Sequence, residues 1–241
     1  METIIQVQEL TKAYDQLLAV DHVSLSVKAG TVFGLLGANG AGKSTTIECI
    51  LGTKTTDSGK VSILNLDPRK DRRRLFQKVG VQFQECDYQP EIKVSELCEE
   101  TACLYKAPAD WKKLCTQFGL ADKTNSAVKN LSGGERQRLF IVLALIPNPK
   151  VVFLDELTTG LDTKARRDVW KILEELKNQG MTIFLTSHFM DEVEALCDEI
   201  CILQKGQIAF YGTITQAIEK SGCGKFEDAY LTLSGEEVDV E

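Results

Sequence analysis

The stretch "GANGAGKST" (residues 37–45) decides how this chain folds. It follows the apolar run "TVFGLLG" (residues 31–37) and matches the pattern GxxxxGK[ST] between a strand and a helix. Glycines let successive backbone N–H groups turn inward around a phosphate chain, and a helix start adds its positive dipole. A merely tight turn would need neither the lysine nor the hydroxyl that follow in register. The sequence therefore predicts a loop that binds a nucleoside triphosphate.

Two side chains of this phosphate loop have separate predicted tasks. Lys43 brings a positive charge to the β and γ phosphates, and the hydroxyl of Ser44 is placed to bind Mg²⁺. The full set of predicted phosphate-binding residues is Gly37, Asn39, Gly40, Ala41, Gly42, Lys43, Ser44 and Thr45.

Carboxylates end a second apolar run. Asp155 and Glu156 close "VVFLDE", and ligands of α/β sheets bind at the carboxyl ends of the strands. We expect Asp155 to hold Mg²⁺ through water and Glu156 to polarise the attacking water. Two acids after a strand also suit a solvated turn, but an intact phosphate loop in the same chain favours a hydrolytic site. His188 follows the run "MTIFLTS" at the same edge, although a lone histidine is more often structural.

The pattern of apolar runs predicts an α/β fold. The three runs described above read as buried parallel strands, and alternating segments before residue 31, "IIQVQEL" and "DHVSLSV", read as an antiparallel edge sheet. Residues 85–149 give no strand signal, so we expect a helical lobe inserted into the sheet domain. Helical patterns cover residues 43–51, 136–145, 164–177 and 189–196. The basic run "RKDRRRL" (residues 69–75) reads as a solvated helix face, and a partner or nucleic-acid contact is a second reading.

The composition and the apolar runs disfavour a nucleic-acid-binding, a membrane-spanning or a secreted protein. The net charge of −7 argues against a primary role on nucleic acid, which demands a basic surface. The longest apolar run is far shorter than the roughly 20 residues of a membrane-spanning helix, and the start lacks the pattern of a signal peptide. Eight scattered cysteines without a CxxC pair read as buried reduced thiols. We expect a cytosolic protein.

The stretch "NLSGGERQRL" (residues 130–139) places a serine and two glycines before an apolar helix. With the phosphate loop, the "VVFLDE" strand, "GLD" (residues 160–162) and His188, it makes the chain resemble the ATP-binding cassette ATPases from residue 4 to about residue 212. The order of several independent motifs carries this resemblance. One residue departs from it, because many members have proline where this chain has Leu157, which loosens the loop leading to Asp162 but removes no functional group.

The resemblance implies a P-loop, RecA-like core (residues 1–84 and 150–224) with an antiparallel β subdomain, an inserted helical subdomain (residues 85–149) and a short tail (residues 225–241). It implies that ATP is the substrate, that Tyr14 stacks on adenine, and that Gln84 reaches Mg²⁺ and the water. In this family Ser132, Gly133 and Gly134 of one subunit close over the γ-phosphate held by the other. A head-to-tail dimer enclosing two ATP is implied, with Asp162 at the subunit contact.

The downstream pattern and the segment "FEDAYLTLSG" resemble exporter ATPases of the daunorubicin-resistance type, which pair with a separate membrane permease. That resemblance implies a subunit held on the cytoplasmic face of the cell membrane by its permease. Two alternatives stay open: a cassette of DNA repair, which usually carries a long coiled-coil insert, and a translation-associated switch, which usually carries two cassettes.

Overall fold

The computed structural model describes residues 2–83, 88–89 and 91–235. They divide into two compact units, one made of Met1–Leu75 with Thr186–Glu241 and the other of Phe76–Leu185. Both units combine helices with strands, so the predicted α/β class is confirmed. No helix among the described residues is long and apolar enough to cross a membrane.

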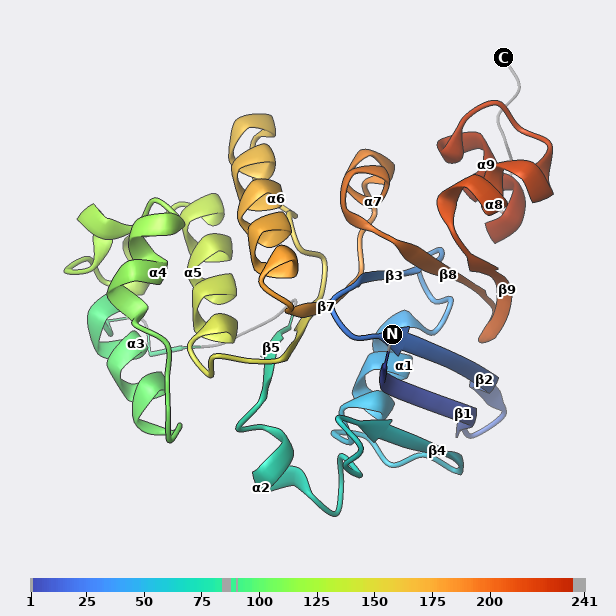
Figure 1. Ribbon diagram of the computed structural model, residues 1–241, viewed down its shortest axis with the longest axis horizontal. Coiled ribbons are helices and arrows are strands. Elements are labelled where there is room, and N and C mark those ends of the chain that lie inside the picture. The colour runs from blue at the N-terminus through green and yellow to red at the C-terminus, as the bar shows by residue number, and fades with distance from the viewer. Residues whose placement is uncertain (1, 84–87, 90, 236–241) are drawn as a thin grey trace. The chain divides into compact units, whose positions relative to one another are not determined.

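The first unit contains the predicted antiparallel sheet. Strand β1 (Thr3–Tyr14) lies between β2 (Leu17–Lys28) and β4 (Ser58–Ile63) (Figure 1). Buried and exposed side chains alternate over the first part of β1, which is the period of 2 that a half-buried strand shows, and a register shift between Val7 and Leu10 makes Leu10 the next buried residue. This sheet therefore takes its register from the sequence pattern.

A second group of strands in this unit carries the phosphate loop. Strand β3 (Val32–Leu36) is buried at every position and pairs in parallel with β8 (Glu199–Gln204), which pairs antiparallel with β9 (Gln207–Gly212). Around them lie α1 (Lys43–Ile50), the short α2 (Arg72–Leu75), α7 (Met190–Leu196), α8 (Ile214–Ser221) and α9 (Phe226–Ser234). Phe226 and Tyr230 of α9 join the core over β8 and β9.

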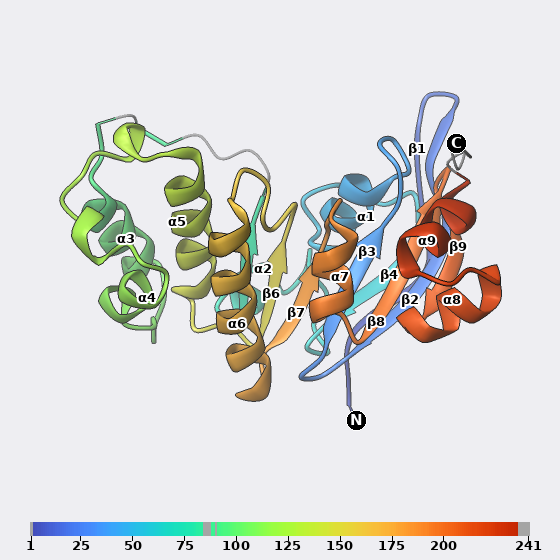
Figure 2. The same cartoon turned by 90° about the horizontal axis from the view of Figure 1, so that it is seen from above.

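The second unit contains three parallel strands together with helices. Strands β5 (Val79–Gln82), β6 (Val151–Leu154) and β7 (Thr182–Leu185) pair in order, and β6 and β7 are entirely buried. Helix α5 (Gly133–Leu145) lies between these strands and α3 (Val94–Cys103) with α4 (Trp111–Gln117) (Figure 2). Short 3-10 turns at Ala121–Lys123 and Val128–Asn130 precede α5, and α6 (Thr163–Asn178) follows β6.

Most predicted elements are present. The three apolar runs form β3, β6 and β7, and the four helical patterns form α1, α5, α6 and α7 within three residues at each end. Helix α5 begins earlier than its apolar pattern because Ser132 caps it ahead of the two glycines. Helices α3, α4 and α5 fall within the predicted insert, whose boundaries remain a prediction.

Candidate active site

The phosphate loop joins the buried strand β3 to α1 through backbone that favours glycine. Gly37, Gly40 and Gly42 have φ of 143°, 79° and 101°. A Cβ at Gly37 would lie 2.4 Å from the carbonyl oxygen of Leu203, and one at Gly42 would lie 2.3 Å from that of Ala19. Only glycine fits these two positions, because both the torsion and the approach of neighbouring backbone exclude a side chain.

Lys43 lies along the inside of this loop. Its ammonium donates to the carbonyl oxygens of Gly37 at 2.6 Å and Ala38 at 3.0 Å, and its side chain is largely buried. Thr46, which the sequence analysis did not single out, fixes the helix start because its backbone N–H and its hydroxyl both donate to Gly42 at 2.8 Å. Asn39, Gly40 and Ser44 are exposed, whereas Ala41 is buried.

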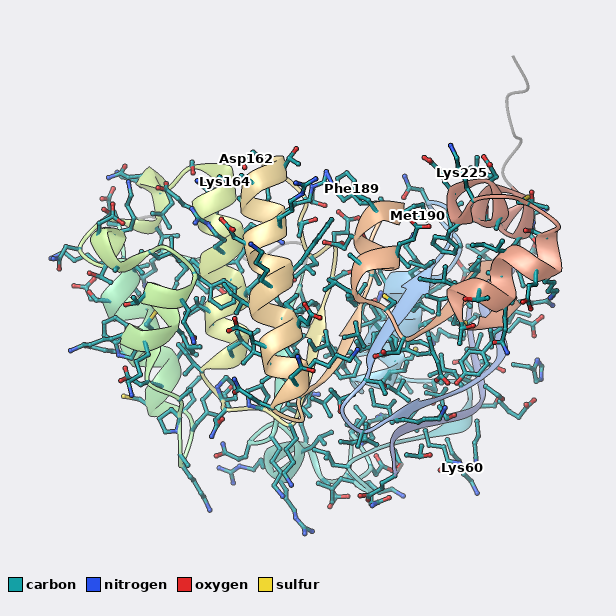
Figure 3. All side chains as sticks on the ribbon, turned by 45° about the horizontal axis from the view of Figure 1, so that its top comes forward. Lys60, Asp162, Lys164, Phe189, Met190 and Lys225 are labelled. Carbon is teal, nitrogen blue, oxygen red and sulfur yellow. The ribbon has the colours of Figure 1, made fainter. Side chains whose placement is uncertain are left out.

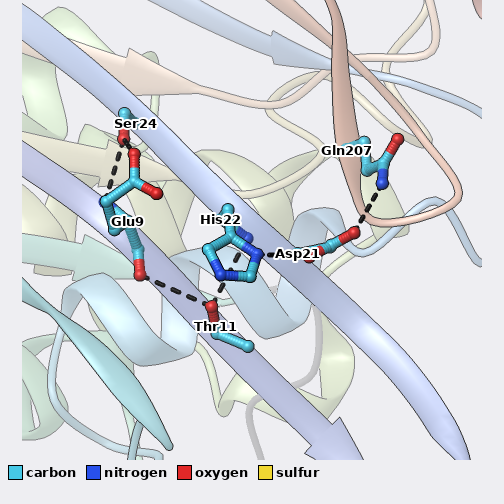
Figure 4. Close-up of polar contacts among 6 residues, drawn as sticks. All are labelled: Glu9, Thr11, Asp21, His22, Ser24 and Gln207. Carbon is cyan, nitrogen blue, oxygen red and sulfur yellow. Dashed lines mark hydrogen bonds and ion pairs between the residues drawn. The ribbon is translucent and has the colours of Figure 1, made fainter.

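The turn between β8 and β9 braces the phosphate loop. The N–H of Gly206 donates to the carbonyl oxygen of Ala41 at 3.0 Å, and the carbonyl oxygen of Gly206 accepts from the N–H of Asp21 at 2.8 Å. The Asp21 carboxylate accepts from the amide of Gln207 and lies 2.6 Å from Nδ1 of His22 (Figure 4). The phosphate loop is thus tied to the surface of β2, a link that no motif signals.

Hydrogen bonding shifts the pKa values of this surface pair in opposite directions. Hydrogen bonds from Gln207 and then His22 lower the pKa of Asp21, and the bond to Asp21 raises the pKa of His22. His22 has φ of 51°, a left-handed value. It lies beside Thr11, Glu9 and Ser24 (Figure 4), and its backbone N–H donates to the hydroxyl of Thr11 at 3.4 Å.

Tyr14 ends β1 and leaves 40% of its surface exposed. The ammonium groups of Lys12 and Lys54 both lie 5.4 Å from its ring centroid, and hydrogen bonds to Glu48 and then Tyr14 raise the pKa of Lys54. An exposed flat ring held by two cations suits a planar base carrying phosphates.

In the second unit, Asp155 and Glu156 directly follow β6, as predicted, and both are half-buried. Glu156 has φ of 50°, a conformation that costs a non-glycine residue about 1–2 kcal/mol. Its carbonyl oxygen accepts from the side-chain amide of Gln137 at 3.2 Å, and that amide also donates to the carbonyl oxygen of Leu157 at 2.9 Å. Leu157 is fully buried, so the residue that replaces the usual proline serves as core.

Two glutamines, Gln82 and Gln84, lie at or just after the end of β5 in the sequence. Gln84, the predicted ligand of Mg²⁺ and water, lies outside the described residues. Gln82 is buried, donates to the carbonyl oxygens of Phe83 at 2.9 Å and Asp155 at 3.1 Å, and therefore ties the end of β5 to the end of β6. Its Oε1 meets no hydrogen-bond donor within the part of the chain that the structure describes.

The signature turn, Ser132 with Gly133 and Gly134, starts helix α5. The hydroxyl of Ser132 accepts from the N–H of Glu135 at 3.2 Å, and the Glu135 carboxylate accepts from the N–H of Ser132 at 2.8 Å, which completes a capping box. Those bonds, with the ion pair to Lys123 at 3.1 Å, lower the pKa of Glu135. The sequence pattern located this turn, and the capping box explains its serine and glutamate.

The remaining predicted residues lie at helix starts. Asp162 caps α6 by accepting from the N–H of Ala165 at 2.8 Å, at the end of the helix where Lys164 also lies (Figure 3). His188 is exposed just before Phe189 and Met190, which begin α7. The hydroxyl of Ser187 accepts from the N–H of Phe189 at 3.0 Å and shapes the turn that carries the histidine.

Each unit by itself carries donor groups of the kind that Mg-ATP requires. A Cβ at Gly40 would meet no atom of the described residues within 4 Å, so the phosphate loop is open at this position. Lys43 and the start of α1 supply positive charge to the loop. The hydroxyl of Ser44 and the carboxylate of Asp155 are the hard oxygen ligands that Mg²⁺ prefers. Among the residues that the structure describes, no group of three or more acidic, histidine or cysteine side chains forms a metal site of another kind.

Comparison with known proteins identifies one family that contains these motifs. The family model described as "ABC transporter" matches residues 20–159. A Nod factor export ATP-binding protein I of Ralstonia nicotianae is 37% identical over 230 residues, covering 93% of this chain and 72% of that protein. The linearmycin resistance ATP-binding protein LnrL of Bacillus subtilis is 34% identical over 237 residues, covering 96% of this chain and 76% of that protein.

A solved structure supports the same assignment. The ATP-binding subunit of an ABC transporter superposes with a TM-score of 0.88 at 26% identity, covering 96% of this chain and 99% of that one. The matched segment, the relatives and the fold agree with the motif order read from the sequence. The chain therefore belongs to the ABC transporter family and is one of its ATP-hydrolysing, ATP-binding subunits.

Proposed function

We propose that two copies of this chain, or this chain and a similar one, close head-to-tail around two Mg-ATP. The observation that carries the proposal is the surroundings of Gly133. This glycine lies in the first turn of α5 with φ in the ordinary helical region, and a Cβ there would meet no atom of the described chain within 4 Å. Glycine in a helix costs about 0.5–1 kcal/mol relative to alanine. A group outside the chain therefore explains the glycine best.

The proposed roles follow from the chemistry of each group. The phosphate loop with Lys43 holds the phosphates, Tyr14 stacks on the adenine, and Ser132, Gly133 and Gly134 of the partner bind the γ-phosphate. Ser44, Asp155 and Gln84 would hold Mg²⁺, which supplies positive charge to the phosphate oxygens when bound. Glu156 acts as general base toward the attacking water, and His188 and Gln84 contact the water and the γ-phosphate.

The partner in transport is proposed from the relatives. The names of the two relatives describe export and resistance, so we propose that this subunit drives an exporter through a separate membrane permease, on the cytoplasmic face of the membrane. Tyr88 and Glu91 precede α3 and lie outside any helix or strand, and the ring of Tyr88 packs against Phe140 of α5 at 5.4 Å between centroids. We propose that a cytoplasmic helix of the permease docks there.

Crosslinking tests this arrangement. The chain is co-expressed with the membrane protein encoded by the neighbouring gene, with a photoreactive residue at Tyr88 or Glu91. We expect adducts with the membrane protein, and the same residue placed at the exposed Glu227 of α9 serves as the control. Adducts only with the second ATPase subunit contradict the docking site, and a chain that stays out of the membrane fraction in the co-expressing cells contradicts the permease.

A further inference from the structure

The side chain of Gln137 connects the signature helix to the hydrolytic loop. Gln137 lies one turn into α5, and its Nε2 donates to the carbonyl oxygens of both Glu156 and Leu157, at 3.2 Å and 2.9 Å. Both acceptors are carbonyl oxygens, so the group that faces them must be the NH₂ end of the amide. One side chain therefore fixes two consecutive peptide groups.

One of the two residues whose carbonyl groups Gln137 holds has a strained backbone. Glu156 adopts φ of 50°, and such a conformation persists only where the surroundings hold it. Within the loop, Thr159 also contributes, since its N–H donates to the carbonyl oxygen of Glu156 at 3.2 Å and its hydroxyl lies 3.4 Å from the carboxylate. Thr159 moves with the loop, however, whereas Gln137 is anchored on a helix whose apolar face is buried.

A second contact joins the same two segments. A Cβ at Gly134 would lie 3.2 Å from Cδ2 of Leu161 and 3.6 Å from the carbonyl oxygen of Gly160. The start of α5 and the loop after β6 are therefore packed closely at two points. A shift of the helix start has to displace the backbone of Glu156, unless the bonds of Gln137 break.

We propose that Gln137 is a positioning residue, which holds the backbone of Glu156 in its strained conformation and so aims the carboxylate at the attacking water. The inference rests on the proposed role of Glu156 as general base. It also gives the signature turn a route to the hydrolytic carboxylate of the same chain, because α5 carries both Ser132 and Gln137. A side chain that only satisfied two carbonyl groups would affect folding stability and leave the chemical step of a folded enzyme unchanged.

Two substitutions in the full chain separate these roles. Gln137→Met keeps the length of the side chain but removes the donor, and Gln137→Lys restores an N–H donor of similar reach. We expect Gln137→Met to lower kcat for ATP about tenfold or more and to leave the dissociation constant for ATP within about twofold, and Gln137→Lys to recover most of the loss. Gln117→Met is the control, since the side chain of this exposed glutamine of α4 makes no hydrogen bond to the described residues.

A double substitution distinguishes positioning of Glu156 from a purely structural role, because it measures whether the effect of Gln137→Met on the rate depends on the Glu156 carboxylate. If both residues act on one step, adding Gln137→Met to Glu156→Gln changes the remaining rate by less than about twofold. A folded Gln137→Met enzyme with wild-type kcat overturns the inference, as does an equal loss in the Met and Lys variants. Should Gln137→Met fail to fold, Gln137→Asn, whose amide ends one methylene short, is judged by the same criteria. Wild-type kcat in Glu156→Gln alone would instead remove the proposed function.

Discussion

The ammonium nitrogen of Lys43 lies 2.6 Å from the carbonyl oxygen of Gly37, the residue that begins the phosphate loop. The lysine thus bonds to the phosphate loop itself, and under the proposed function we expect it to exchange these bonds for bonds to phosphate oxygens when ATP binds.

Replacing this lysine therefore tests its contribution to ATP binding. A hydrogen bond to a charged group contributes about 1.5–3 kcal/mol, so Lys43→Met is expected to weaken ATP binding by roughly 10- to 150-fold. Calorimetric titration measures the change, and Lys60→Met, an exposed lysine of β4, is the control. Equal ATP affinities in Lys43→Met and wild type would place the phosphates elsewhere.

The phosphate loop contains a matched pair of glycines. Gly42→Ala forces a Cβ to 2.3 Å from the Ala19 carbonyl oxygen at φ of 101°, whereas Gly40→Ala meets no atom of the described chain within 4 Å at φ of 79°. We expect Gly40→Ala to cost about 1–2 kcal/mol for the left-handed backbone alone, and Gly42→Ala to cost clearly more. Urea unfolding without nucleotide measures both, and equal midpoints would contradict this geometry.

Substitutions of Tyr14 test the proposed contact with adenine. Stacking of a base on an aromatic ring is worth about 1–3 kcal/mol, so Tyr14→Ala should raise the dissociation constant for ATP by roughly 5- to 150-fold and leave kcat at saturating ATP largely intact. Tyr14→Phe keeps the ring and should bind within about threefold of wild type. Loss of affinity in the Phe variant equal to that in the Ala variant would show that the hydroxyl, and not the ring, makes the contact.

His22 makes part of the stability depend on pH. The bond to Asp21 raises its pKa above 6.5, so the folded state binds the proton more tightly than the unfolded state. This contribution is fully present below pH 6.5 and is lost as the pH rises through the raised pKa. His22→Asn tolerates the left-handed backbone and does not titrate. The difference in Tm between wild type and His22→Asn should therefore shrink from pH 6 to pH 9, and a difference that grows with pH would be contrary to this pairing.

The sequence predicted the elements whose signals are local. The buried strand β3 and the glycines after it specify the phosphate loop, and the apolar run of β6 places Asp155 and Glu156 at its end. The bracing of the phosphate loop by Gly206 and Asp21 was not predicted, because residues 165 or more positions apart come together only through the pairing of β3, β8 and β9. The hydrogen bonds from Gln137 to the carbonyl oxygens of Glu156 and Leu157 were not predicted either, because they too form only when the chain is folded. A surface glutamine in a helix carries no signal of the distant carbonyl groups that it meets.

Sedimentation of purified Glu156→Gln tests the central claim that two chains share each ATP. Glutamine keeps the shape of the side chain but removes the base, a loss that typically lowers the rate by about 10²–10⁴-fold, so the variant should load ATP and retain it. We expect a monomer without nucleotide or with ADP, twice that mass with ATP, and a monomer again when Ser132→Arg is added, because a bulky cation would fill the approach to the γ-phosphate. A monomer at saturating ATP, or a dimer that forms equally well with ADP, would contradict a site built from the phosphate loop of one chain and the signature turn of another.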